Sequence, residues 1–419
     1  MGRLAAQWQK LPVSLRELCI DTTLRCGQSF RWRKFDDEWR CSLHGRILSL
    51  KQDAECLYYR ATFPDKAAVA ASKGVLSPRG DGADNDDVVD DTETLLRGYF
   101  HLQLDLGALY DQWSRDDANF RKKAPQFSGI RILNQDAWEA LVCFICSSNN
   151  NISRISQMAH KLCTHYGPLL GTIDGEAFHD FPSPAALAAP SVEAHLRQLG
   201  FGYRAKYIAQ TAQTLCNDKP AGWLEQLRNP ACPAPGQTEP VAVVATDGNA
   251  CSPSYKTAHE QLLLLSGVGP KVADCVALMG LGWSEAVPVD THVWQIAVRD
   301  YKFKRIASKT FSRAIHDAVG DHFRGLWGPY AGWAQSVLFT ANLKSFSEQL
   351  QGVGGRSSED KDKSLKTDVK LEMKQEEEAQ TTELVTTKRR RRKTVVKVEA
   401  DVKVAVVQET ETRSKRRRR

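Results

Sequence analysis

The chain has 419 residues and a formal net charge of +7, with 57 Lys and Arg against 50 Asp and Glu. This length allows two or three domains and a sizeable core, and the basic balance suits a polyanionic partner without proving one. No stretch is long and apolar enough to span a membrane, there is no secretory signal pattern, and the eleven cysteines lack the spacing of a disulfide framework. We therefore expect a protein of a reducing compartment.

The first part of the chain, residues 1–133, alternates short apolar and polar runs such as EWRCSLHGRILSLKQ and ECLYYRATF. A period near two with many aromatic residues predicts antiparallel strands. We expect a twisted sheet packed against helices such as LGALYDQWSR, residues 106–115. An acidic stretch near residues 77–94 has few large apolar side chains and predicts a disordered insertion.

Helical periodicity replaces the alternation in residues 134–348, which are predicted to form an all-α region. Cys143 and Cys146 form a CxxC pair, but they lie inside the apolar run WEALVCFICSS and no second pair is nearby. We therefore expect two core cysteines rather than a metal site. Residues 229–254 are rich in Pro, Gly and small side chains and predict a long inserted loop.

Two polar groups of residues lie near expected helix ends. Asn149 is the first of three asparagines that follow a helical apolar run; asparagines are poor helix formers but hydrogen-bond well, and Arg154 follows shortly. Tyr203 and Arg204 follow two glycines in an expected turn between helices. From the residues alone, the preferred interpretation of the asparagine run is a helix-ending loop, and that of Tyr203 is a half-buried aromatic ring.

The sequence SGVGP predicts a tight turn between two helices, the first of which carries the leucine-rich residues 262–265. Gly267, Val268 and Gly269 form the turn, where glycine permits backbone conformations closed to other residues. Pro270 suits the first position of the second helix because its missing N–H is not needed there. Free N–H groups at a helix N-terminus bind phosphate, so the pattern predicts a helix-hairpin-helix on a DNA backbone.

Lys271 follows this turn at once, and Asp290 comes nineteen positions later. A nucleophilic lysine must be an uncharged amine, whereas a free lysine has a pKa of about 10.4. Taken alone, Lys271 is best interpreted as a phosphate-contacting or solvated residue. Asp290 is expected at a helix N-cap, yet the apolar residues 287–289 precede it. A carboxylate and an amine that converge on a DNA strand can break an N-glycosidic bond, because the anion stabilises the sugar cation and the amine forms a Schiff base.

At these residues the chain resembles a eukaryotic 8-oxoguanine DNA glycosylase/AP lyase of the helix-hairpin-helix superfamily. The resemblance rests on six stretches in family order: CGQSFRW (26–32), FICSSNNNISRI (144–155), LGFGYRAKYI (199–208), SGVGPKVADC (266–275), VPVDTHVWQIAVRDY (287–301) and GPYAGWAQSVLF (328–339). It implies an α+β fold, with an N-terminal twisted antiparallel β-sheet domain followed by all-α helix-hairpin-helix glycosylase domains. No cysteine follows Asp290, so the iron–sulfur cluster of related enzymes is not expected.

The resemblance assigns Lys271 and Asp290 to catalysis and four further residues to a base pocket. Gln335 and Phe339 are four positions apart and share one helix face, although Phe339 and Cys275 taken alone are ordinary core residues. By resemblance, Phe339 and Cys275 sandwich a flipped base and Gln335 reads its Watson–Crick edge. Gly27 offers its carbonyl oxygen to the N7 hydrogen that 8-oxoguanine has and guanine lacks.

The remaining assignments by resemblance concern DNA. Asn149 would fill the space vacated by the flipped base, and Tyr203 would wedge beside it. Arg154 and Arg204 would hydrogen-bond the orphaned cytosine. His292 would contact a substrate phosphate, although a histidine at a helix start is more often structural.

We therefore expect a monomeric, bifunctional DNA glycosylase/AP lyase that excises 8-oxoguanine opposite cytosine and needs no metal or organic cofactor. Two alternatives stay open at this point. A monofunctional glycosylase for alkylated bases would keep Asp290 but have no use for Lys271. A non-catalytic DNA-binding module would need neither residue.

The last segment, residues 349–419, consists of acidic and basic blocks and predicts a disordered basic tail. It contains two dense basic clusters, Lys388 to Lys393 and Lys415 to Arg419. These clusters predict binding to a nuclear import receptor, and hence a nuclear protein. Residues 1–16 carry no acidic side chain, a faint cue for an additional mitochondrial fraction.

Overall fold

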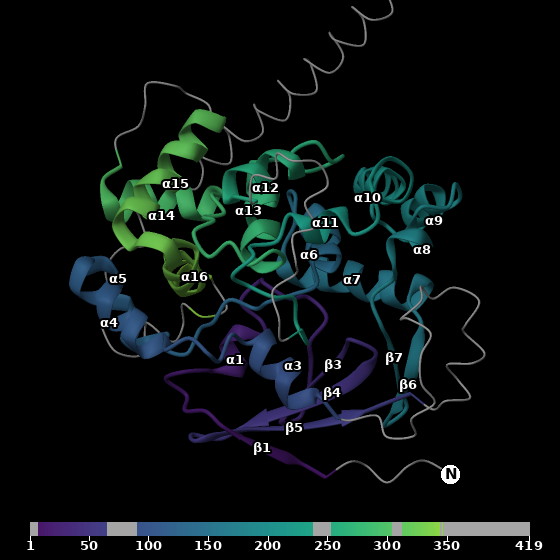
Figure 1. The fold of residues 1–419 in the computed structure, drawn as a ribbon, viewed down its shortest axis with the longest axis horizontal. Coiled ribbons are helices and arrows are strands. Elements are labelled where there is room, and N and C mark those ends of the chain that lie inside the picture. Colours follow the sequence, from purple (N-terminus) through teal and green to yellow (C-terminus); the bar gives the residue numbers. More distant parts are fainter. Residues whose placement is uncertain (1–6, 65–89, 238–252, 304–311, 344–345, 347–419) are drawn as a thin grey trace, which may run out of the picture. The chain divides into compact units, whose positions relative to one another are not determined.

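The computed structural model describes residues 7–64, 90–237, 253–303, 312–343 and 346 (Figure 1). Its main sheet is antiparallel, with five strands in the order β1-β5-β4-β3-β2. The strands are β1 (Gln9–Pro12), β2 (Arg33–Phe35), β3 (Glu38–Leu43), β4 (Arg46–Gln52) and β5 (Cys56–Thr62). The β3–β4 turn is formed by His44 and Gly45, both with positive φ, as a two-residue hairpin requires. The predicted antiparallel sheet is confirmed.

Helix α3 (Thr92–Tyr99) packs on this sheet and shares one hydrophobic cluster with the strands. Helix α4 (Leu106–Asp116) does not belong to that cluster, because its Trp113 lies in the core of the helical region. The prediction that residues 106–115 cover the sheet was therefore wrong. An amphipathic stripe shows that a helix buries one face, but it does not identify the partner.

The predicted acidic insertion is only partly described, since residues 65–89 lie outside the described ranges. Its expected end was wrong by a few positions, because α3 already begins at Thr92. Glu93 lies in the first turn of this helix, where a negative charge is favourable, and pairs with Arg97 one turn later.

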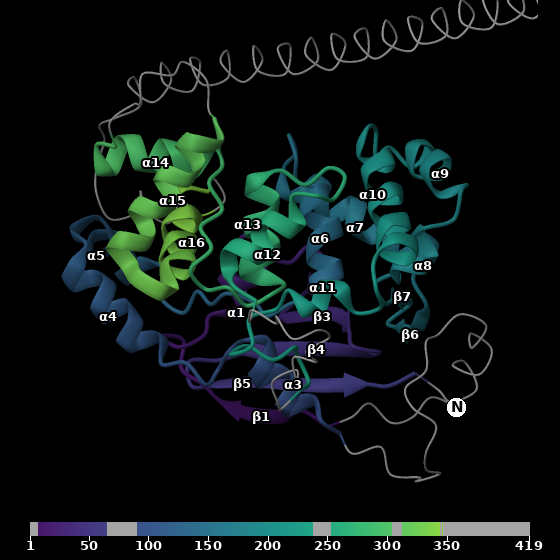
Figure 2. The same cartoon turned by 45° about the horizontal axis from the view of Figure 1, so that its top comes forward.

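The rest of the described residues are mainly helical. The elements are α1 (Ile20–Thr23), α5 (Ala118–Lys123), η1 (Ala124–Gln126), α6 (Ala137–Ile145), α7 (Ile152–Tyr166), β6 (Leu169–Ile173), β7 (Glu176–His179), α8 (Pro184–Leu187), α9 (Val192–Gln198), α10 (Arg204–Gln213), η2 (Thr214–Asp218), α11 (Trp223–Gln226), α12 (Tyr255–Leu262), α13 (Pro270–Met279), α14 (Thr291–Tyr301), α15 (Arg313–Trp327), η3 (Gly328–Tyr330) and α16 (Ala331–Asn342). Every residue of α6 is buried, and α6 packs against α13 beside α12 (Figure 2). Cys143 and Cys146 lie in or next to α6 and are buried core residues, as predicted.

One feature departs from the all-α prediction for this region. Strands β6 and β7 form a small antiparallel hairpin that contacts β3 and β4 of the main sheet. Its turn consists of Asp174 and Gly175, both with positive φ. An Asp-Gly pair between short apolar runs is a strong hairpin signal, so the sequence did contain the cue.

The predicted loop of residues 229–254 is described only at its two ends. Its first residue is fixed, because the Asn229 N–H donates to the carbonyl of Leu281 at 2.8 Å. Its last residue, Ser254, caps α12 through its side chain. Residues 238–252 and the predicted basic tail from residue 349 lie outside the described ranges. The described sheet and helices belong to one compact unit, so the predicted domain boundary after residue 133 stays a prediction.

Candidate active site

One pocket brings together the six residues predicted for catalysis and for the base pocket. They come from four separate places in the chain: the loop after α1, helix α13, the start of α14, and helix α16. The lining residues are Gly27, Lys271, Cys275, Asp290, Gln335 and Phe339, with Cys26, Gln28, Phe144, Met279, Pro288, Ser336 and Thr340. Residues up to 312 positions apart, as Gly27 and Phe339 are, thus surround one cavity.

Lys271 lies in the first turn of α13, as predicted, and is half-buried. Its Nζ donates to Oγ of Ser147 at 3.3 Å and lies 5.1 Å from the centre of the Phe144 ring. Burial lowers the pKa of Lys271, but the neighbouring Cys275 and Asp290 raise it, and the net pKa lies above the ordinary value. In the structure the amine of Lys271 is therefore protonated, and the uncharged amine that attack on a sugar requires stays a prediction. The ammonium must lose a proton before the nitrogen can attack.

Cys275 lies one helical turn after Lys271 and lines the same pocket. Burial raises the pKa of its thiol to about 11, although Lys271 acts in the opposite direction. At neutral pH the side chain is therefore a neutral thiol beside an ammonium group. Such a polarisable, largely apolar group can contact a flat ring.

Asp290 is the N-cap of α14, as predicted. Its Oδ1 accepts hydrogen bonds from the N–H groups of His292 and Val293, both at 2.9 Å. Val289 immediately before it is fully buried, so the carboxylate stands at the edge of a packed segment. In the part of the chain that the structure describes, Asp290 and Lys271 form no ion pair with each other, and both remain available to a ligand in the pocket.

The three remaining residues predicted for the base pocket line the same cavity. Gln335 is buried on α16, and Phe339 lies half-buried one turn later. Gly27 has a φ of +89°, and a Cβ atom there would lie 3.8 Å from the Phe339 ring. The exposed ring of His292 meets Phe339 edge to face, with 5.9 Å between the ring centres. His292 therefore borders the pocket.

A second predicted group meets at the loop between α6 and α7. Asn149 is exposed and has a φ of +46°, a conformation that asparagine tolerates better than most residues. The hydroxyl of Tyr203, a side chain 45% exposed, donates to the Ser148 carbonyl at 3.1 Å. Arg204 is only 4% exposed and donates to the carbonyls of Ser148 and Asn149. The structure thus joins Asn149, Tyr203 and Arg204.

Arg154, the fourth member of the predicted DNA-binding group, lies outside these contacts. It is exposed in the first turn of α7. Its own N–H donates to Oδ1 of Asn151, the N-cap of that helix, at 2.9 Å. Its position next to the loop is compatible with a contact to a DNA strand.

The predicted hairpin turn is present between α12 and α13. Helix α12 ends at Leu262, so the prediction that the following leucines belong to it was wrong. Gly267 has a φ of +79°, and a Cβ atom there would lie 2.6 Å from the Tyr207 side chain. Gly269 is extended rather than left-handed and faces open space. The left-handed backbone and the close approach of Tyr207 therefore require glycine at Gly267. At Gly269 neither applies, and the missing side chain leaves room for another molecule.

Two further details of the turn bear on phosphate binding. Gly269 caps α13 without any side-chain hydrogen bond, which leaves N–H groups of the first turn for a ligand. Val268 contributes a buried side chain, and its N–H already donates to the carbonyl of Leu265 at 3.3 Å. The amides at the start of α13 are thus better phosphate donors than that of Val268.

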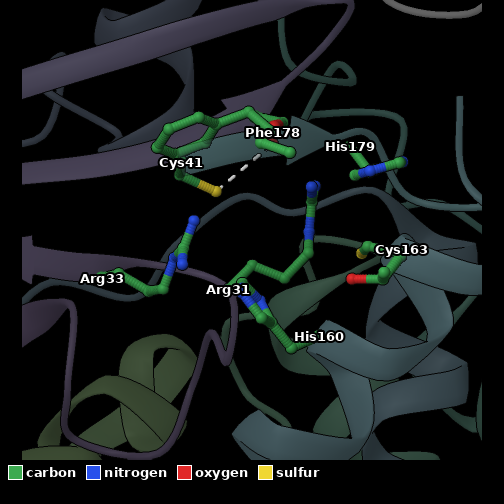
Figure 3. A pocket seen from close by; sticks show the side chains of 10 residues that line it. Arg31, Arg33, Cys41, His160, Cys163, Phe178 and His179 are labelled. Atoms are coloured by element: carbon green, nitrogen blue, oxygen red, sulfur yellow. Dashed lines mark hydrogen bonds between the residues drawn. The ribbon is translucent and has the colours of Figure 1, made fainter. Parts of the chain in front are cut away.

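Another cavity lies among β3, α7 and β7 and is lined by Arg31, Arg33, Cys41, His160 and Cys163, among others (Figure 3). Its cations are matched by nearby carboxylates. Arg31 forms a two-pronged ion pair with Glu139, at 2.8 and 2.6 Å, and Arg33 pairs with Glu176 at 3.0 Å. Burial raises the pKa of Cys41 and Cys163, which keeps both thiols neutral. Because its charges are paired, we interpret this cavity as structural.

Analysis of the sequence missed the residues that support the lysine. Ser147 accepts the hydrogen bond from Lys271, and Phe144 lies beside the ammonium. Phe144 reads as one more apolar residue of a buried helix, and Ser147 as part of a polar loop. Neither carries a local signal, because the contact joins residues 124 positions apart.

The described residues contain no group of three or more His, Cys, Asp or Glu side chains that could hold a metal ion. Among the described helices, none combines the length and apolarity needed to cross a membrane.

Comparisons with known proteins identify the family of this chain. A family model for the 8-oxoguanine DNA glycosylase N-terminal domain matches residues 10–141, and one for HhH-GPD superfamily base excision DNA repair proteins matches residues 142–319. The N-glycosylase/DNA lyase of Saccharomyces cerevisiae is 37% identical over 87% of this chain and 92% of its own. The N-glycosylase/DNA lyase OGG1 of Arabidopsis thaliana is 35% identical over 82% of this chain and 83% of its own.

Solved structures share the fold at lower identity. The 8-oxoguanine glycosylase/lyase of Clostridium acetobutylicum, in complex with double-stranded DNA containing cytosine opposite 8-oxoG, has a TM-score of 0.59 at 23% identity, over 80% of this chain and 97% of its own. The match of residues 142–319 to the helix-hairpin-helix family identifies a base excision DNA repair protein. More specifically, the chain belongs to the family of 8-oxoguanine DNA glycosylases and is an N-glycosylase/DNA lyase that acts on DNA. The alternative of a non-catalytic binding module is thereby excluded.

Proposed function

We propose that this enzyme excises 8-oxoguanine opposite cytosine from duplex DNA by base flipping, and then cleaves the strand by β-elimination. The observation that carries the proposal is the common pocket of Lys271 and Asp290 with Gly27, Cys275, Gln335 and Phe339. The match of residues 10–141 to the 8-oxoguanine glycosylase domain supports the choice of base. An enzyme that acts on a base must take it out of the stack, and this pocket offers both an aromatic face and polar edges.

Each pocket residue has a role in the proposed recognition. Phe339 and Cys275 contact the two faces of the flipped base, and the amide of Gln335 reads its Watson–Crick edge with one donor and one acceptor. The Gly27 carbonyl accepts the N7 hydrogen of the lesion. Because guanine has no such hydrogen, its N7 lone pair would face a carbonyl oxygen. The loss of one buried hydrogen bond is worth roughly 1–3 kcal/mol, so this contact contributes to discrimination without supplying all of it.

Outside the pocket, the group at the α6–α7 loop is proposed to hold the opened duplex. Asn149 occupies the vacated space, Tyr203 wedges beside it, and Arg154 and Arg204 hydrogen-bond the orphaned cytosine. Arg204 currently donates to the loop carbonyls, so its contact with cytosine requires a partial change of partners. The hairpin amides and His292 are proposed to bind backbone phosphates.

The proposed chemistry begins when the ammonium of Lys271 gives up its proton. Its nitrogen then bonds to C1′ as the bond from C1′ to the base breaks, and the base leaves with a proton. The carboxylate of Asp290 stabilises the positive charge that develops on the sugar. The sugar ring opens to a Schiff base with Lys271. Loss of a C2′ proton then expels the 3′ phosphate, which nicks the strand.

Borohydride trapping on a duplex with 8-oxoguanine opposite cytosine tests the proposal, because borohydride reduces a Schiff base to a stable covalent adduct. The wild-type chain should be trapped, and Lys271→Gln should lose trapping while it still binds the lesion duplex. Lys256→Gln, which changes an exposed lysine on the preceding helix, is the matched control and should be trapped normally. Normal trapping of Lys271→Gln would refute the nucleophile. Excision by a wild-type chain that is never trapped would favour the monofunctional alternative.

We also propose that the enzyme is a nuclear monomer and that the clusters Lys388 to Lys393 and Lys415 to Arg419 bind an import receptor. These clusters lie outside the described residues. Replacement of both clusters by glutamine should move a fluorescently tagged chain out of the nucleus. An unchanged distribution would contradict the assignment.

A further inference from the structure

Several buried side-chain hydrogen bonds hold the loop that carries Gly27. Gln28, which follows Gly27, is only 2% exposed. Its Nε2 donates to the Arg131 carbonyl at 2.8 Å and to Sγ of Cys26 at 3.2 Å. Its Oε1 accepts from the N–H of Leu133 at 3.0 Å. Both ends of this amide are therefore fixed, and the side chain ties the loop to the segment 131–133.

A second glutamine holds the same loop from the other side. Gln135, 4% exposed, donates through Nε2 to the main-chain carbonyl of Gln28 at 3.1 Å. The N–H of Gln135 donates in turn to the carbonyl of Met279 at 2.8 Å. Met279 is the last residue of α13 and lines the pocket. Gln135 thus connects the loop to the helix that carries Lys271 and Cys275.

These contacts restrict the peptide unit whose carbonyl oxygen is proposed to accept a hydrogen bond from the flipped base. The peptide unit between Gly27 and Gln28 contains the Gly27 carbonyl, and its orientation depends on the backbone angles of the two residues. The positive φ of Gly27 and the fixed side chain and carbonyl of Gln28 restrict those angles on both sides. A rigid surrounding shell is what holds a recognition group within a fraction of an ångström of its working position.

We propose that Gln28 and Gln135 are positioning residues that orient the Gly27 carbonyl and so set the discrimination between 8-oxoguanine and guanine. This inference rests on the proposed function, since it assumes that the Gly27 carbonyl reads N7 of the flipped base. Neither glutamine takes part in the chemical steps. If the two amides only satisfied backbone hydrogen bonds, their loss would lower the stability of the fold alone. If they are positioning residues, their loss changes the relative affinity for 8-oxoguanine and guanine.

The decisive variant is Gln135→Met, which has a similar volume and removes the donor to the Gln28 carbonyl. Binding of the full chain, in a Lys271→Gln background, is measured on two duplexes that differ only in 8-oxoguanine or guanine opposite cytosine. We expect the ratio of the two dissociation constants to fall about 10-fold, the effect of misplacing one buried hydrogen bond. Cleavage of an abasic duplex by chains with an intact Lys271 should fall much less, because no base is present to be read.

Asn134→Leu is the matched control. Asn134 is a buried amide next to Gln135, but its side chain donates to the Pro233 carbonyl at 2.9 Å and accepts from Arg228 at 3.1 Å, and neither hydrogen bond goes to the Gly27 loop. It should lower stability without a change in the binding ratio. Gln28→Met should lower the ratio at least as much as Gln135→Met, and if it fails to fold the Gln135→Met result decides alone.

Three results would overturn the inference, and they are distinguishable. If folded Gln135→Met keeps the wild-type ratio while wild type prefers the lesion, the glutamines are structural and the proposed function stands. If the parent chain itself binds both duplexes equally, the proposed substrate is wrong and the inference falls with it. An equal reduction of the ratio in Asn134→Leu would also refute a specific positioning role.

Discussion

The two cavities of this enzyme contain similar ingredients and use them differently. Each brings a cation from the interior close to neutral cysteine thiols. In the cavity of Figure 3, Arg31 is locked in a two-pronged ion pair with Glu139. In the active-site pocket, Lys271 donates to a hydroxyl at 3.3 Å and interacts with the neutral thiol of Cys275, and Asp290 bonds to backbone amides instead of the lysine. An interior charge that is already ion-paired stabilises the fold, whereas an interior charge that is not ion-paired remains available to a substrate.

The comparison predicts that changes in the two cavities affect different properties. Asp290→Asn should have the largest effect on catalysis. Asparagine caps helices about as well as aspartate, so the free energy of unfolding should change by less than about 0.5 kcal/mol. Single-turnover excision of 8-oxoguanine should nevertheless slow by at least about 100-fold, as expected when one preorganised electrostatic contact is lost. Substantial destabilisation with nearly normal excision would show that Asp290 is mainly a cap.

Glu139→Gln should show the opposite behaviour. It leaves the guanidinium of Arg31 buried without its main counter-charge. Burial alone lowers the pKa of Arg31, whereas the charge of Glu139 raises it, and the net pKa lies well above the ordinary value. Breaking a buried pair in this way costs about 3–5 kcal/mol, which denaturant unfolding would measure. Single-turnover excision per folded molecule should stay close to the wild-type rate.

The matched control for this second prediction is Glu176→Gln, which removes the partner of Arg33 at the rim of the same cavity. Both side chains of that pair are partly exposed, so its loss should cost less than about 1 kcal/mol. Equal destabilisation by the two variants would contradict the assignment of the Arg31–Glu139 pair as the buried structural contact. A large loss of excision in folded Glu139→Gln would contradict the separation of the two cavities.

The same comparison explains how much the sequence could reveal. The hairpin turn, Lys271 at the start of a helix and Asp290 at an N-cap follow from local rules, because glycine, proline and capping preferences act within a few residues. The common pocket does not follow from such rules. Gly27 and Phe339 meet only in the folded chain, and each taken alone looks structural. Their assignment needed a family resemblance.

The ion pair between Arg31 and Glu139 could not be predicted from the sequence either. Arg31 and Glu139 are 108 positions apart, and nothing local distinguishes them from exposed residues of the same type. The pKa shift of Lys271 could not be predicted from the sequence for a related reason. The position in a helix N-terminus was visible, but the neighbouring Cys275 and Asp290 that raise its pKa act through the folded geometry.

A third buried charge lies on the active-site helix itself and sharpens the comparison. Asp274 is fully buried on α13, next in sequence to Cys275. Its carboxylate accepts from the Tyr255 hydroxyl at 2.6 Å and lies 3.1 Å from Nε2 of His316 and 3.4 Å from Nε2 of His259. The carboxylate therefore has partners on α12 and α15, and we expect it to be structural like Arg31 rather than catalytic like Asp290.

This network yields the smallest of the predicted effects, a dependence of stability on pH. Burial lowers the pKa of His316, but Asp274 and Asp317 raise it by more, so its pKa lies above the ordinary value. The other groups in the network are His259, Tyr255 and Arg324, which reaches the Tyr255 hydroxyl. A histidine with a raised folded-state pKa stabilises fully below its unfolded pKa of about 6.5, and the contribution disappears as pH rises through the folded-state pKa.

The measurement compares His316→Asn with the wild-type chain by denaturant unfolding between pH 5.5 and 9. The variant should be less stable by about 1 kcal/mol at the acidic end, and the difference should shrink as pH rises. His322→Asn, which changes an exposed histidine on the same helix, should show no such trend. A difference that grows with pH would mean that His316 is neutral in the folded chain. A large loss of excision in His316→Asn at neutral pH would show that the Asp274 network supports catalysis and not only the fold.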